Sequence, residues 1–252
     1  MKFEAIASSS HGNAYVVSSG SSRLLIEAGI AHRTLLRAVG GSDGLSACLL
    51  SHEHNDHAKC VRELLMDGIT VYMSLGTALA LDCAAIVRET DTEAEYMGTG
   101  GVELLEAGCT YEIGGFQVRP FRTFHDCAEP FGFFIVDKDG ESFVFATDTV
   151  NMAYRFLPPV TILAIEANHN AEILARSERM PVKTRERIAN THMEITRLCQ
   201  NLRRMDLSRC REIVLLHLSD ATSNENDFVF RVERAVPKGI RVTAAPKMME
   251  RK

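Results

Sequence analysis

The chain has 252 residues, of which 46% are hydrophobic and 24% are charged, and its formal net charge is −5. This length suits one large domain or two small ones, and the composition is typical of a globular protein. No segment approaches the run of about 18 apolar residues that a membrane span needs, so we expect no membrane association. The acidic balance also argues against a strongly basic, nonspecific nucleic-acid binder.

The cysteines and the first residues of the chain predict a location. The seven cysteines form no CxxC pair, which is typical of reduced thiols. The first seven residues lack the longer apolar core of a signal peptide. We therefore expect a cytoplasmic protein.

Apolar runs predict alternating strands and helices in the first half of the chain. Strands are expected over residues 3–7, 14–18, 23–27, 45–51 and 70–73, and helices over 30–39, 58–66 and 76–87. The polar, glycine-containing stretch 90–101 is expected to be a loop.

The second half is predicted to contain a second set of strands followed by helices. Strands are expected over residues 102–105, 109–113, 116–121, 131–136, 142–147, 161–166, 212–216 and 240–245. A helix is expected over 171–175, and the capping-box spacing of Thr191 and Glu194 predicts another that runs to Arg203. This order predicts an α/β (α+β) protein, with residues 1–252 forming a single four-layer αββα domain.

A dense cluster of metal-ligating side chains follows one predicted strand. His52, His54, Asp56 and His57 lie between the strand at 45–51 and the helix at 58–66. Residues two apart in an extended segment point the same way, so His52 and His54 can bind one ion together. Asp56 and His57 lie past the bend and point elsewhere, which predicts two adjacent metal ions. The alternative is a surface loop that happens to be rich in histidine.

The spacing His52-x-His54-x-Asp56-His57 resembles the HxHxDH signature of the metallo-β-lactamase superfamily. That family continues with a lone His, then an Asp after a strand, then a final His after another strand. His125, Asp148 and His217 follow in that order, each at the end of an apolar run. The resemblance implies the αββα sandwich and seven metal ligands, namely His52, His54, Asp56, His57, His125, Asp148 and His217.

Two divalent ions are expected, with the carboxylate of Asp148 bridging them. The expected ligands are His52, His54 and His125 for one ion and Asp56, His57 and His217 for the other. Imidazole ligands favour zinc, and the mixed oxygen and nitrogen donors leave manganese and iron as alternatives. Two such ions can hold a bridging hydroxide, because each lowers the pKa of bound water toward about 7. That hydroxide would attack a phosphorus or a carbonyl carbon.

Within the superfamily, the chain is most similar to the compact YycJ/WalJ-type branch, which is regarded as DNA exonucleases. The similarity lies in the turn ending Gly12-Asn13, in residues 166–169 and in residues 217–219. His192 falls where that branch has Gly-His-Leu-Ser, a segment that this chain matches in part. We expect His192 in the first turn of a helix, where it would hold a substrate phosphate. A helix-start histidine that faces solvent is the alternative.

Two further features have both a functional and a structural interpretation. Glu27 stands where the family commonly has an Asp that supports the metal site from behind, and the alternative is a solvated or capping glutamate. The segment 176–187 carries Arg176, Arg179, Lys183, Arg185 and Arg187. It could follow a nucleic-acid backbone or be a solvated face, and it contains no aromatic residue for base stacking.

The sequence thus predicts a dinuclear metal-dependent hydrolase, a phosphodiesterase or exonuclease-like nuclease with Asp56 and His192 as catalytic residues. Its expected partner is nucleic acid or another phosphodiester, and the oligomeric state is open. One alternative is a hydrolase of small phosphodiesters, thioesters or lactones. The other is a di-iron redox protein, which would normally come with an electron-carrier domain.

Overall fold

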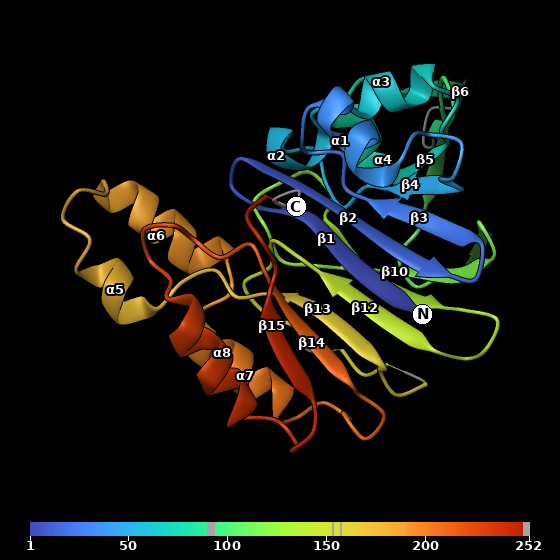
Figure 1. Cartoon of the computed structure of the whole chain (residues 1–252). Helices are drawn as coiled ribbons and strands as arrows, with labels where there is room; N and C mark the ends of the chain where they lie inside the picture. The colour runs from blue at the N-terminus through green and yellow to red at the C-terminus, as the bar shows by residue number, and fades with distance from the viewer. Residues whose placement is uncertain (90–93, 153, 157, 249–252) are drawn as a thin grey trace.

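The computed structural model describes residues 1–89, 94–152, 154–156 and 158–248. Two β-sheets face each other, and helices lie on their outer sides (Figure 1). The expected four-layer αββα fold is therefore confirmed.

The first sheet holds six strands in the order β1-β2-β3-β4-β5-β8. Strands β1 to β3 pair antiparallel, and β3, β4, β5 and β8 pair parallel. The strands are β1 (Lys2–Ser9), β2 (Gly12–Ser19), β3 (Ser22–Ile26), β4 (Ala47–Leu49), β5 (Val71–Ser74) and β8 (Val102–Leu105). The helices of this half are α1 (His32–Val39), α2 (Asn55–Ala58), α3 (Val61–Met66) and α4 (Leu75–Ala80).

The second sheet repeats this plan with seven strands in the order β15-β14-β13-β12-β11-β10-β9. Its strands are β9 (Tyr111–Ile113), β10 (Phe116–Arg122), β11 (Phe131–Val136), β12 (Ser142–Ala146), β13 (Ile162–Glu166), β14 (Glu212–Leu216) and β15 (Arg241–Ala244). Strands β12 to β15 are parallel. Its helices are α5 (Ala171–Ala175), α6 (Val182–Thr191), α7 (Ile195–Leu202) and α8 (Glu225–Glu233). Helices α5 and α6 project beside α7 and α8 (Figure 1).

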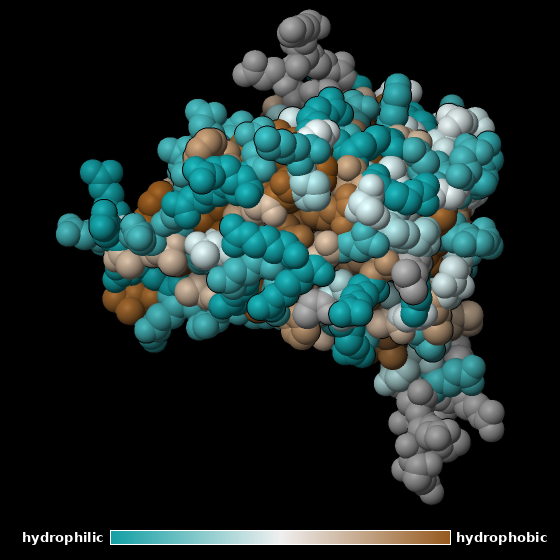
Figure 2. Space-filling model, turned by 90° about the horizontal axis from the view of Figure 1, so that it is seen from below, coloured by the Kyte–Doolittle hydropathy of each residue, from teal (hydrophilic) through white to brown (hydrophobic). Residues whose placement is uncertain are grey.

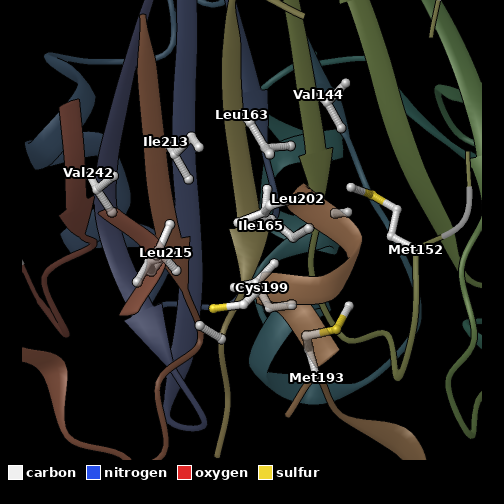
Figure 3. Packing of buried hydrophobic residues seen from close by; sticks show 14 of the residues in the cluster. Val144, Met152, Leu163, Ile165, Met193, Cys199, Leu202, Ile213, Leu215 and Val242 are labelled. Atoms are coloured by element: carbon white, nitrogen blue, oxygen red, sulfur yellow. The ribbon is translucent and has the colours of Figure 1, made fainter. Parts of the chain in front are cut away.

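The period of two in the strands explains why two sheets stack. In β13, Ile162 and Ala164 face the first sheet, whereas Leu163 and Ile165 face the helices. Figure 3 shows Leu163 and Ile165 beside Cys199 and Leu202 of α7. Both faces of the central strands are thus buried, which is why these strands are almost wholly apolar.

One predicted helix and one predicted loop were wrong. The alanine- and leucine-rich stretch 76–87 was expected to be helical, but α4 ends at Ala80, and Asp82 adopts a left-handed backbone with φ 55°. Residues Ala84–Glu89 form β6 instead, which pairs antiparallel with β7 (Ala94–Gly98) inside the expected loop. Strand pairing overrides helix propensity here. Residues 90–93 of that loop lie outside the described residues.

Hydrophilic residues cover most of the face drawn in Figure 2, and hydrophobic residues show mainly in the recesses between them. Within the described residues, no helix is both long enough and apolar enough to span a bilayer. The seven cysteines are all free thiols.

Candidate metal centre

The seven predicted ligands converge at the carboxyl ends of strands from both sheets. The loop after β4 and helix α2 supply His52, His54, Asp56 and His57, while His125, Asp148 and His217 follow β10, β12 and β14. Asp148 and His217 take left-handed backbones, with φ 44° and 54°. Such a conformation costs a non-glycine residue about 1–2 kcal/mol. It also turns the chain sharply at the strand end, which aims both side chains into the centre.

The loop after β4 is held in place by a very close backbone approach. The amide of Ala28 donates to His57 O at 2.7 Å, and the amide of Gly29 donates to Asn13 O at 2.8 Å. A Cβ atom on Gly29 would lie 1.7 Å from Asp56 O. Only glycine therefore fits at residue 29, because any side chain would displace α2.

His52, His54 and His125, which we call the first ligand group, surround one point together with Asp148. His52 Nε2 lies 3.1 Å and His125 Nε2 3.3 Å from His54 Nδ1. Asp148 Oδ2 lies 3.7 Å from His52 Nε2 and 3.3 Å from His125 Nε2. Ligand atoms arranged tetrahedrally around an ion, with bonds of about 2.0–2.1 Å, stand about 3.3–3.4 Å apart. The first ligand group therefore fits a divalent ion.

Asp56, His57 and His217, which we call the second ligand group, lie beside the first. Asp56 Oδ2 is 3.4 Å from His57 Nε2 and 3.5 Å from His217 Nε2. Asp148 Oδ2 is 3.5 Å from His57 Nε2, so one carboxylate oxygen faces both groups. His217 Nε2 is buried and has no hydrogen-bond partner among the described residues. A buried polar atom of this kind is costly unless it is satisfied, and a cation beside Asp56 would satisfy it.

Neutral groups orient the first ligand group, whereas carboxylates orient the second. The hydroxyl of Ser51 lies 2.8 Å from His52 Nδ1, and the carbonyl of Thr191 lies 3.0 Å from His125 Nδ1. Behind the second group, Glu27 Oε1 is 3.5 Å from His57 Nδ1, and Glu166 Oε1 is 3.4 Å from His217 Nδ1. Both glutamates are fully buried at the ends of strands. Glu27 thus lies where the family resemblance places a supporting carboxylate.

Burial and these carboxylates move the histidine pKa values in opposite directions. Burial is the largest influence on the pKa values of His52 and His125 and lowers both. Burial also acts to lower the pKa of His57 and of His217. Asp148 and the neighbouring carboxylates outweigh it, so the pKa of His57 rises and that of His217 rises to about 10. In a metal-free centre, protons on the second ligand group therefore supply the positive charge that the acids attract.

His192 does not lie at the start of a helix, so that expectation was wrong. Thr191 is the last residue of α6, and His192 follows it with an extended backbone, φ −123° and ψ 155°. Glu194, rather than Thr191, caps α7, because its side chain accepts from the amides of Thr196 and Arg197. The ring of His192 is nevertheless at the centre, 4.9 Å from the ring of His125 and 5.5 Å from that of His217.

Glu166 is the supporting residue whose role the sequence reasoning missed. Its Oε1 lies 2.6 Å from His192 Nδ1, and its Oε2 accepts from the amides of Thr149 and Met193. Burial raises the pKa of Glu166, but the charge of His192 and side-chain hydrogen bonds to His192 and His217 lower it to about 2. His192 gains a raised pKa in return, against the effect of its burial. The signal was an acid as the last residue of an otherwise apolar strand, β13.

In the basic segment 176–187, an acid pairs with one of the cations, Arg187. Helix α6 has no buried residue, and its last carbonyl, that of Thr191, contacts His125. Arg187 forms two hydrogen bonds to Asp126, at 2.5 and 2.9 Å, and Arg185 donates to Ala175 O.

His169 is buried and is absent from the groups of close metal-ligating atoms among the described residues.

Comparison with known proteins extends the resemblance over most of the chain. Residues 22–218 match a family model described as a beta-lactamase superfamily domain. The exodeoxyribonuclease WalJ of Streptococcus pneumoniae is 29% identical over 228 residues, covering 86% of this chain and 81% of WalJ. The exodeoxyribonuclease YycJ of Bacillus anthracis is 25% identical over 238 residues, covering 91% and 81%. The crystal structure of the metallo-beta-lactamase fold protein YhfI from Bacillus subtilis superposes with a TM-score of 0.69 at 16% identity, covering 98% of this chain and 97% of YhfI.

Proposed function

Because this chain belongs to the beta-lactamase superfamily, we propose that it is a metal-dependent phosphodiesterase that acts on nucleic acid. The observation that carries the proposal is the pair of adjoining ligand groups that share Asp148 Oδ2. The exodeoxyribonuclease activity named for WalJ and YycJ supports a nucleic-acid substrate.

We assign one divalent ion to the first ligand group and one to the second, with Asp148 between them. Zinc fits the imidazole-rich donor set, and manganese and iron fit it as well. Bound divalent ions supply Lewis acidity, which stabilises charge on a phosphoryl oxygen and makes water a stronger acid. The seven free thiols support a reducing location such as the cytoplasm.

The chain's own residues would orient the substrate and move protons. Asp56 fixes His57 and His217 relative to each other, so its loss should disable the second ligand group. Glu166 holds His192 through Nδ1 and favours its protonated form. The ring then offers its Nε2–H to a substrate phosphate oxygen or to the leaving oxygen.

The test is degradation of 5′-phosphorylated linear DNA with added manganese. The comparison is wild type against Asp56→Ala, with Asp67→Ala as a matched control. Asp67 is an acid of the same half that pairs with His32 away from the centre. We expect wild type and Asp67→Ala to degrade the DNA and Asp56→Ala to leave it intact. If metal-loaded wild type left DNA and RNA intact, the nuclease proposal would fail and small phosphodiesters and thioesters would be tested next.

A further inference from the structure

A surface rich in arginine and aromatic residues lies beside the chain segment that leaves the metal centre at Asp148. Tyr154, Arg155 and Phe156 line a hollow of about 300 Å³ together with Arg119 and Phe121. Tyr154 and Arg155 also line a second hollow, together with Arg197 and Arg204 of the α7 region. We call these residues the arginine–aromatic surface. It consists of Arg119, Phe121, Tyr154, Arg155, Phe156, Arg197 and Arg204.

The surface is strongly cationic. Arg155 and Arg204 form no ion pair with any described residue, and both are exposed. Arg119 and Arg197 donate only to carbonyl oxygens, those of Gly108 and Val150, and these bonds leave their charges unneutralised. Among the described residues that line these hollows and an adjoining one, Asp206 is the one acid, and Arg122 of the first hollow pairs with Glu129. The positive charge therefore exceeds the negative charge, as a polyanion requires.

The rings of Tyr154 and Phe156 are packed on one side and partly exposed on the other. The Tyr154 ring packs on Phe121 with centroids 4.8 Å apart, and Phe156 lies 5.2 Å from Phe121 and 5.3 Å from Phe134. Tyr154 and Phe156 nevertheless keep part of their surface open to solvent. Partly exposed rings held among arginines are the arrangement on which bases of a single strand stack.

Two hydrogen bonds between Phe124 and the segment after Asp148 connect the surface to the metal centre. Phe124 N donates to Thr149 Oγ1 at 3.1 Å, and Val150 N donates to Phe124 O at 3.0 Å. Phe124 directly precedes His125, and 51% of its surface is exposed. The chain thus runs from the ligand Asp148, past this exposed ring, to Tyr154 within six residues.

We propose that the arginine–aromatic surface binds the single-stranded part of a nucleic-acid substrate and leads its end to the metal centre. This inference rests on the proposed nuclease function. The free arginines would contact phosphates, and Tyr154 and Phe156 would stack with bases. A small phosphodiester that fills only the metal centre would not reach this surface.

The experiment measures kcat/KM of the metal-loaded enzyme on short single-stranded DNA and RNA at several salt concentrations, and on bis-p-nitrophenyl phosphate. The variants are the double variant Arg155→Gln/Arg204→Gln and the single variant Tyr154→Leu, which keeps an apolar contact with Phe121. We expect the double variant to lose about tenfold or more on oligonucleotides. The slope of log kcat/KM against log salt concentration should become shallower by about 1.4. The double variant removes two phosphate contacts, and each contact on a single strand contributes about 0.7. Tyr154→Leu should lose about fivefold or more with an unchanged slope, because it removes stacking and no charge.

Two control variants alter comparable side chains elsewhere. Arg33→Gln removes an exposed arginine of α1, and Phe230→Ala removes an exposed ring of α8. Both should act as wild type on every substrate, and all variants should retain wild-type rates on the small diester. The proposed role of the surface is wrong if its variants cleave oligonucleotides as wild type does. It is also wrong if they lose equal activity on oligonucleotides and on the small diester. Either result leaves the nuclease activity of the wild type standing. Hydrolysis of the small diester alone by wild type means instead that the proposed function fails.

Discussion

The histidines of the two ligand groups lie in opposite surroundings. In the first group, His52 and His125 are oriented by a serine hydroxyl and a backbone carbonyl. In the second, His57 and His217 are backed by the buried carboxylates of Glu27 and Glu166. The first ion would therefore sit among neutral imidazoles, and the second among negative charges. The two sites thus differ in one ligand, the carboxylate of Asp56 in the second group, and in the residues that support their histidines.

Asp148→Ala should have the largest effect, because it removes the oxygen that both groups share. The activity expected on a phosphodiester falls on the order of 10³-fold, since bound ions contribute several kcal/mol of charge stabilisation. The measurement is phosphodiesterase activity together with metal content by elemental analysis. Both metal stoichiometry and activity should fall, whichever metal is used. A variant that kept two ions and wild-type activity would contradict the shared role.

Changes behind the ligands should mainly affect the group whose histidine they contact, although Glu27 also accepts from the amide of Ser51. Glu27→Gln and Glu166→Gln should each weaken the second ion about 10–100-fold, the usual cost of losing a supporting residue. Ser51→Ala, the matched change behind His52, should weaken the first ion instead. Titration against a chelator of known affinity measures the dissociation constant of each ion in each variant, and so shows which of the two ions is weakened.

Glu166→Gln should also differ from Glu27→Gln in its kinetics, because Glu166 alone holds His192. We expect a further loss of kcat and an altered acidic limb of the pH–rate profile only in Glu166→Gln. Identical profiles for the two variants would argue against a role for His192 in proton transfer or phosphate binding.

Much of the fold could be predicted because its signals are local. The buried strands show as apolar runs, and the residues that turn sharply away from them stand directly at their ends. The hairpin of β6 and β7 was missed because an alanine- and leucine-rich stretch favours a helix until strand pairing outweighs it. The helix boundary at His192 was misplaced because two caps were available in sequence, Thr191 and Glu194, and only the packed chain uses the second.

The residues of the metal centre also differ in whether a local sequence signal predicts them. The cluster His52–His57 can be recognised by itself, because four ligand-type side chains lie within six residues. His125, Asp148 and His217 could be placed only through a family resemblance, since each is a single residue after a strand. The contact between Glu166 and His192 joins residues 26 positions apart. It depends on how α6 returns to the end of β13, which no sequence period encodes.

The two ligand groups should also differ in the pH dependence of their metal affinity. The pKa values of His52 and His125 are lowered by burial, so these two ligands of the first group have no proton to lose near neutral pH. The pKa of His217 is raised to about 10, so an ion entering the second group must displace its proton. Affinity of the second ion should therefore rise about tenfold per pH unit between about pH 7 and 9 for that proton. Affinity of the first ion should change little.

The same shift predicts how the metal-free protein responds to pH. A pKa that is higher in the folded than in the unfolded chain contributes stability that is complete below about pH 6.5. For His217 that contribution is lost as pH rises through about 10. The melting temperature of the chelated protein should thus fall from pH 7 to pH 10, and that of the metal-loaded protein should fall less. Equal pH dependence with and without metal would mean that the proton on His217 and the second ion do not compete for one site.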